Sequence, residues 1–154
     1  MRIAGVDPGV TGAIALHEGG RLVKVYDLPA YDGRTDGATL ASLFKELSPD
    51  VVYLENTQPM PKNGSIASYS LGFNTGVVVG VVQSLQHPLI RVRPSVWKQK
   101  MGVTKLDKNG VRGIVREIYP DQAPLFKRVM DHNRAEAVLI SRYGVFNEIA
   151  EAST

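Results

Sequence analysis

RIAGVDPGVTG, residues 2–12, sets an apolar run directly before Asp7, which is followed at once by Pro8 and Gly9. A short apolar run of this kind predicts a strand that is buried on both faces. An ionised carboxylate at the end of such a strand is costly unless a cation compensates its charge. An aspartate before Pro-Gly is also a common turn former, so Asp7 alone does not decide between a turn and a cation site.

The rest of the chain predicts one α/β domain over residues 1–154. Its sheet has five strands of mixed direction, three antiparallel and then two parallel, and helices flank it. The turn signal Glu18-Gly19-Gly20 joins the second and third strands. The expected strands are 2–7, 12–17, 21–28, 51–55 and 88–93, and the expected helices are 36–48, 65–86, about 109–119 and about 132–150.

Composition limits the class of protein. The chain has no cysteine, which excludes a disulfide framework and a thiolate metal site. We expect the mature protein to start at Met1, because a strand begins there in place of a signal or transit segment. Apolar runs are broken by glycine and polar residues, so we expect no membrane span of about 18 residues. These features predict a cytoplasmic protein.

A second carboxylate follows the apolar run VVYLE, residues 51–55. A right-handed crossover lays this strand parallel to strand 2–7, which brings Asp7 and Glu55 to the same edge of the sheet. Two adjacent carboxylates repel each other unless divalent cations lie between them. Oxygen ligands favour Mg²⁺ or Mn²⁺ over zinc. The alternative for Glu55 is a residue that caps a loop.

A third acidic group comes late, in DHNRAEAVLISRYG, residues 131–144. Glu136 lies between two alanines on an otherwise apolar helix, so the helix can approach the sheet and present a carboxylate to it. His132 precedes it by four residues and shares its helical face. Asp131 reaches that face only from the lead-in to the helix, and the alternative is that it caps the helix.

Basic residues are concentrated between Arg91 and Arg116. Eight Lys or Arg stand there against Asp107 alone, a net charge of +7 in a chain whose total is +3. Such segregation indicates a polyanionic partner, or else a solvated basic face. If the partner is a polyanion, we expect contacts with it from Arg91, Arg93, Lys98, Lys100 and Lys105.

Together, IAGVDPGVTGAIAL, VVYLEN, PSVWKQKMG and DHNRAEAVLI resemble the RuvC-type Holliday-junction resolvases, in particular their phage and plant-organelle branches. The resemblance covers nearly the whole chain. It implies a ribonuclease H-like (retroviral-integrase) fold and an endonuclease that resolves four-way DNA junctions by paired symmetric nicks. It also implies two Mg²⁺ (or Mn²⁺) ions per active site and a homodimer.

Carried onto this sequence, the resemblance assigns metal binding and catalysis to Asp7, Glu55 and Glu136. The family pattern has an acid or histidine three residues before the last acid, where this chain has Asn133. Asp131 or His132 must then supply the remaining ligand. One of Lys98, Lys100 and Lys105 would lie near the scissile phosphate.

The loop after Glu55 gains a role from the same resemblance. Lys62, Asn63 and Ser65 would hold the junction backbone, and Met60 and Tyr69 would stack on unpaired bases. The alternative is a loop whose apolar residues anchor it to the core. Trp97 is expected to be a buried anchor for the basic segment, with stacking on a base as the alternative.

Small residues repeat every four positions in the following helix. Because glycine costs a helix about 1 kcal/mol relative to alanine, this repeat indicates close packing, and we expect a homodimer through it. The repeat consists of Ser68, Gly72, Gly76 and Gly80.

Three other functions compete. DPGVTG resembles the phosphate loop of actin-like ATPases, which need two such domains around a nucleotide. A non-catalytic nucleic-acid-binding module leaves the paired carboxylates unexplained. Another ribonuclease H-like nuclease, acting on RNA/DNA hybrid or branched DNA, fits the same acids. The expected partner is branched DNA and not a membrane, in the cytoplasm of a bacterial or phage-infected cell, with an organelle as the alternative.

Overall fold

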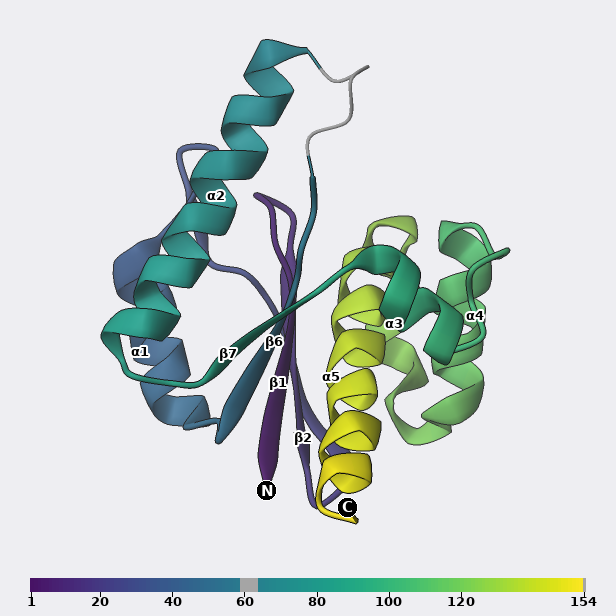
Figure 1. The fold of residues 1–154 in the computed structure, drawn as a ribbon. Helices are drawn as coiled ribbons and strands as arrows, with labels where there is room; N and C mark the ends of the chain where they lie inside the picture. The colour runs from purple at the N-terminus through teal and green to yellow at the C-terminus, as the bar shows by residue number, and fades with distance from the viewer. Residues whose placement is uncertain (59–63, 154) are drawn as a thin grey trace.

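A computed structural model describes residues 1–58 and 64–153. Its main sheet has five strands in the order β3-β2-β1-β6-β7, and β4 and β5 form a separate hairpin (Figure 1). The strands are β1 (Arg2–Asp7), β2 (Ala13–Glu18), β3 (Arg21–Asp27), β4 (Ala30–Tyr31), β5 (Arg34–Thr35), β6 (Val51–Glu55) and β7 (Leu89–Val92). The helices are α1 (Gly37–Leu47), α2 (Ser65–Ser84), α3 (Pro94–Lys100), α4 (Lys108–Ile118) and α5 (His132–Glu151), with short 3₁₀ turns at Pro120–Phe126 and Val129–Asp131.

Strand β1 occupies the centre of the sheet. It pairs antiparallel with β2 and parallel with β6, with Val6 opposite Leu54. Strand β7 is parallel to β6 on its other side. The predicted mixed sheet, three antiparallel strands followed by parallel ones, is therefore confirmed.

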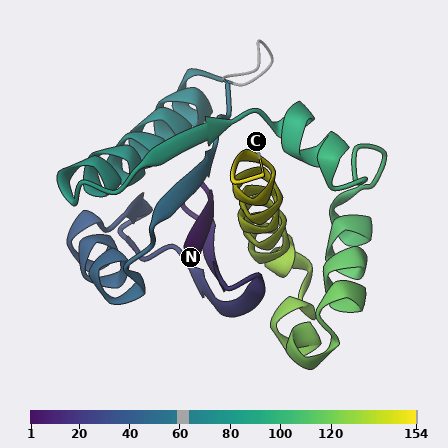
Figure 2. The same ribbon diagram turned by 60° about the horizontal axis from the view of Figure 1, so that its bottom comes forward.

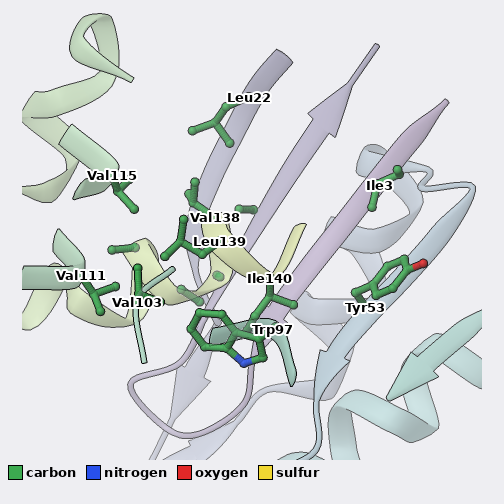
Figure 3. Close-up of a cluster of buried hydrophobic side chains, with 14 of the residues drawn as sticks. Ile3, Leu22, Tyr53, Trp97, Val103, Val111, Val115, Val138, Leu139 and Ile140 are labelled. Carbon is green, nitrogen blue, oxygen red and sulfur yellow. The ribbon is translucent and has the colours of Figure 1, made fainter. Parts of the chain in front are cut away.

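Helices cover both faces of the sheet (Figures 1 and 2). Helices α1 and α2 lie on one face, over Ala4 and Val6 of β1. Helix α5 lies on the opposite face, over Ile3, and α3 and α4 pack outside it. Figure 3 shows this second core, where Trp97 reaches the side chain of Ile140 on α5. Burial on both faces explains why β1 is apolar at successive positions.

Helix α5 lies unusually close to β1. A Cβ atom at Gly5 would clash with the backbone of Ser141 and Ala137, and one at Gly144 would come within 2.6 Å of the Tyr53 ring. Only glycine at these two positions permits the approach. As a result, the start of α5 lies beside the end of β1, as the small residues around Glu136 predict.

The short elements of the chain were not predicted. The hairpin β4-β5 is only two residues per strand, with its turn at Asp32 and Gly33 in positive φ. Helix α3 has seven residues and begins with Pro94 in its first turn. The short 3₁₀ turns precede α5. Elements this short carry no hydrophobic period by which a sequence could reveal them.

Helix α2 is packed along a narrow stripe. Its buried residues are Asn74, Val78 and Val82, and Asn74 accepts hydrogen bonds from the backbone N–H (2.7 Å) and hydroxyl (2.9 Å) of Thr35. By length and composition alone, α2 would suffice to cross a membrane. Length and composition therefore do not exclude a span at α2, and the expectation of no membrane span stays a prediction.

Candidate active site

Three carboxylates from distant parts of the chain meet at one edge of the sheet. Asp7 and Glu55 are the last residues of the neighbouring parallel strands β1 and β6, and Glu136 lies in the second turn of α5. The charges of Glu55 and Glu136 both act on Asp7, and that of Glu136 acts on Glu55. We call Asp7, Glu55 and Glu136 the carboxylate cluster. The predicted meeting of Asp7 with Glu55 is confirmed.

The cluster is poorly hydrated. Asp7 is 7% exposed and Glu55 6% exposed. Burial, reinforced by the charges of Glu136 and Glu55, raises the pKa of Asp7 well above its ordinary value. Burial also raises the pKa of Glu55. Each carboxylate would be relieved of this cost by a cation in contact with it.

Helix α3 supplies two donors to the cluster. The buried Trp97 donates its indole N–H to Glu55 Oε1 over 2.9 Å. Lys98 Nζ lies 2.9 Å from Glu136 Oε1 and packs over the Trp97 ring, 5.1 Å from its centroid. Both donors favour the ionised state of the cluster, since each lowers the pKa of Glu55.

The donor set suits a hard divalent cation. Three carboxylates offer only oxygen ligands, as Mg²⁺ and Mn²⁺ prefer. Over residues 1–58 and 64–153, no three His, Asp or Glu side chains stand ready to hold an ion together. One carboxylate oxygen of Glu55 is bonded to Trp97, and one of Glu136 is paired with Lys98. The residues therefore fit a metal after these two contacts rearrange.

The structure does not bring Asp131 into the cluster. Its carboxylate accepts from the Arg128 backbone N–H (2.7 Å) and guanidinium Nε (3.0 Å), and Arg134 Nη1 lies 3.7 Å away. Burial opposes ionisation, but these hydrogen bonds and charges outweigh it and lower the pKa of Asp131. In these contacts Asp131 ties the 3₁₀ turn to the start of α5.

His132 is also held elsewhere. Its Nδ1 lies 3.0 Å from the Val129 carbonyl oxygen, which can only accept, so Nδ1 carries the proton of this hydrogen bond. Neither residue considered for the remaining ligand position contacts the other carboxylates in this arrangement. For Asp131 or His132 to bind a metal, the 3₁₀ turn and the first turn of α5 would have to adopt another conformation.

Two residues at the site were not predicted. Asn133 donates its amide to the Thr11 carbonyl (2.5 Å) and hydroxyl (3.1 Å), so it joins α5 to the loop that follows Asp7. Lys108, at the start of α4, acts on Asp7 electrostatically. Asn133 occupies the position where the family pattern has an acid or histidine. Lys108 was counted in the basic segment, but no feature of the sequence distinguished it from the other lysines there.

Most of the residues predicted to contact DNA have exposed side chains. Arg91, Arg93, Lys100 and Lys105 are exposed, and Ser65 begins α2. Lys98 is different, because it is half-buried in its ion pair. Lys62, Asn63 and Met60 lie outside the described residues.

A hollow continues from the end of β6 toward α3. It is lined by Asn56, Thr57, Gln58, Arg93, Pro94 and Ser95. The hollow begins at the residue after Glu55, so an extended anionic chain that passes the cluster would meet the Arg93 guanidinium next.

Comparison of the whole structure with solved structures identifies the fold. RuvC from Thermus thermophilus superimposes with a TM-score of 0.71 at 20% identity, over 98% of this chain and 97% of that one. This chain has the RuvC fold. A second structure of the T. thermophilus enzyme, solved "in complex with Holliday junction substrate", also superimposes on this RuvC fold. Its TM-score is 0.70 at 20% identity, over 98% of this chain and 96% of that one. A fowlpox virus resolvase solved with Holliday junction DNA matches with a TM-score of 0.61 at 15% identity, over 97% and 99% of the two chains.

Sequence comparison finds weaker similarity than the comparison of structures does. No protein-family model matches the chain. One curated relative, "Holliday junction resolvase MOC1, chloroplastic" of Chlamydomonas reinhardtii, is 26% identical over 94 residues. That match spans 60% of this chain but only 11% of the relative. The expected ribonuclease H-like fold is confirmed, and the resemblance to RuvC-type resolvases agrees with every one of these similarities.

Proposed function

We propose that this chain is a metal-dependent endodeoxyribonuclease that resolves four-way DNA junctions. The observation that carries the proposal is the convergence of Asp7, Glu55 and Glu136 from β1, β6 and α5 in a chain with the RuvC fold. Proteins of this fold with similar sequence are named as Holliday-junction resolvases. Buried carboxylates beside a basic segment repel a phosphate unless metal intervenes, which disfavours a non-catalytic binding module.

The carboxylate cluster would hold Mg²⁺ or Mn²⁺, two ions per site. Such ions activate a water for attack on the phosphorus and neutralise the leaving 3′-oxygen. Asp7 interacts electrostatically with both other carboxylates, so together with Glu55 and Glu136 it would hold the ions. Glu55 is oriented by the Trp97 indole, and Glu136 is carried by a helix that Gly5 and Gly144 fix against the sheet. Rigid placement of this kind lowers the cost of reaching the transition state.

The basic residues would bind the DNA backbone. Lys98 and Lys108 act on Asp7 from two different helices, so both are placed to neutralise the scissile phosphate. Arg93, which lines the hollow at the end of β6, would take the adjoining phosphate. Arg91, Lys100 and Lys105 are exposed for contacts farther along the junction arms.

The same proposal includes a homodimer through α2. Gly72, Gly76 and Gly80 are exposed on this helix, and a Cβ atom at any of them would meet nothing within 4 Å in the described chain. Tyr69, on the same helix, is 64% exposed. The glycines therefore have no packing purpose among the described residues, and a two-fold partner helix would give them one.

A cleavage assay tests the proposal. The protein is incubated with a four-way junction, a linear duplex of the same sequence and an RNA/DNA hybrid, each with Mg²⁺ or EDTA. We expect paired symmetric nicks in the junction only, dependent on Mg²⁺ and lost in Asp7→Asn while junction binding persists. Cleavage of the hybrid alone would favour the ribonuclease H alternative, and ATP hydrolysis without nicking would favour the ATPase alternative.

The cellular location belongs to the same proposal. We infer a cytoplasmic protein from the composition, and the chloroplastic relative makes an organelle the alternative. Localisation of a tagged chain in its host cell distinguishes the two.

A further inference from the structure

Lys98 is the cation most closely engaged with the carboxylate cluster. Its ammonium is 2.9 Å from Glu136 Oε1, and its charge also acts on Asp7 and Glu55. Lys108, by contrast, acts on Asp7 and not on Glu55 in these interactions. Among the described residues, Lys98 is thus the cation whose interactions include all three carboxylates.

The geometry of α3 holds the ammonium in this place. The Trp97 ring is buried and lies below it at 5.1 Å, and the indole N–H is fixed on Glu55. The side chains are 32% exposed for Lys98 and 14% exposed for Glu136, so the ion pair is only partly screened by water. The ammonium is attracted both by the face of the aromatic ring and by the carboxylate.

We infer that Lys98 is a built-in counter-ion of the metal-free cluster, and that a divalent cation must displace its ammonium from Glu136 to bind. This inference rests on the proposed function, since it concerns the same metal centre. It explains why three oxygen-rich side chains meet without forming a ready-made ion cage. The displaced ammonium remains tethered to α3 beside the cluster, where it can pair with an incoming phosphate.

In this account, a divalent cation and the Lys98 ammonium compete for the same carboxylates. The free energy of metal binding is reduced by whatever the Lys98 contact contributes to the metal-free protein. Removal of the ammonium leaves the carboxylates repelling each other, so the metal-free protein is destabilised and the metal is bound more tightly. A single lysine would thus restrain metal loading until DNA offers its ammonium another anion.

Two variants of one helix provide a matched test. Lys98→Met and Lys100→Met each remove one positive charge from α3, but Lys100 is exposed and has no ion pair with the cluster. Mn²⁺ is titrated into each protein without DNA, and free Mn²⁺ is followed by electron paramagnetic resonance. We expect the dissociation constant to fall about tenfold in Lys98→Met, a change of the size that loss of a partly buried ion pair produces, and less than about twofold in Lys100→Met. Lys98→Arg keeps the positive charge, so its dissociation constant for Mn²⁺ should stay near that of the unaltered protein.

A second measurement does not depend on any variant. Crystals of the unaltered protein in EDTA and in Mn²⁺ should show Lys98 Nζ on Glu136 in the first and more than a hydrogen-bond length away in the second. Equal Mn²⁺ affinity in Lys98→Met and Lys100→Met, or a Lys98–Glu136 pair that persists with metal bound, would overturn the inference while the metal centre stands. If the unaltered protein binds no Mn²⁺, or Asp7→Asn binds it equally well, the metal centre itself is wrong and this inference falls with it.

Discussion

Trp97 and Glu55 are joined by a hydrogen bond of 2.9 Å from the indole N–H to the carboxylate, so a buried core residue of α3 orients a residue at the end of β6. Trp97→Phe keeps the aromatic packing and removes this donor. Because the hydrogen bond lowers the pKa of Glu55, its loss raises that pKa further. We expect the acidic limb of the cleavage pH profile to move to higher pH and stability to fall by about 2 kcal/mol. An unchanged limb in a folded variant would show that the indole does not tune Glu55.

Asp7→Asn should stabilise the metal-free protein while it abolishes cleavage. The folded-state pKa of Asp7 is raised, so its contribution to stability is present at low pH and is lost as pH rises through that pKa. In EDTA near pH 8, we expect the variant to gain about 1 kcal/mol or more in urea unfolding. Asp121→Asn, which removes an exposed carboxylate, controls for the change of charge. A destabilised Asp7→Asn would mean that the cluster favours folding without metal.

Because of His17, we expect the free energy of unfolding to decrease in mild acid. It is buried in a network in which Nδ1 lies 2.8 Å from Ser141 Oγ and Nε2 lies 2.7 Å from the Tyr119 hydroxyl. Burial and the charge of Arg142 lower its pKa to about 4, from 6.5 in the unfolded chain. The unfolded state therefore binds the proton first, and about 3 kcal/mol is lost as pH falls from 6.5 to 4.

The contribution of His17 is isolated by comparison with His17→Gln. The raised pKa values of Asp7 and Glu55 act in the opposite direction over part of the same range, and they cancel in the difference between the two proteins. We expect that difference to shrink steadily below pH 6.5 in urea titrations. A constant difference would place the imidazole in contact with solvent.

Gly76→Ala tests the α2 dimer. An added Cβ meets nothing in the described chain, so the helix should gain about 1 kcal/mol in the monomer. In a close two-fold contact the same methyl group would separate the helices, and we expect the dimer dissociation constant, measured by light scattering, to rise at least about tenfold. Gly113→Ala on α4 is the control, since its Cβ also meets nothing nearby. Equal dimerisation in both variants would remove α2 from the interface.

Asn133→Asp tests why this chain lacks the family acid at that position. The new carboxylate cannot donate to Thr11 and adds a negative charge near the cluster, so the metal-free protein should lose about 1–2 kcal/mol. Mn²⁺ should raise the melting temperature of this variant more than that of Asn133→Ala, which loses the same hydrogen bonds without adding charge. An equal response would show that position 133 does not reach the ion.

The fold and all three residues of the carboxylate cluster could be predicted from the sequence, because they depend on long patterns. Apolar strands that end in Asp7 and Glu55 require only parallel pairing to meet, and Glu136 between small residues requires only a close helix. The start of α5 could not be predicted, since Asp131 was equally able to cap, to bind metal or to pair with Arg128. Its actual partner depends on a 3₁₀ turn without a sequence period. Trp97 was predicted as an anchor, but its donation to Glu55 depends on the rotamer of a seven-residue helix.

The location of a bound ion is the most direct test of the central claim. Crystals soaked in Mn²⁺ and measured at the manganese absorption edge should show anomalous density bounded by Asp7, Glu55 and Glu136. The same crystals of Asp7→Asn should lose it. Anomalous density confined to other parts of the protein, or none in the unaltered protein at saturating Mn²⁺, would contradict the account.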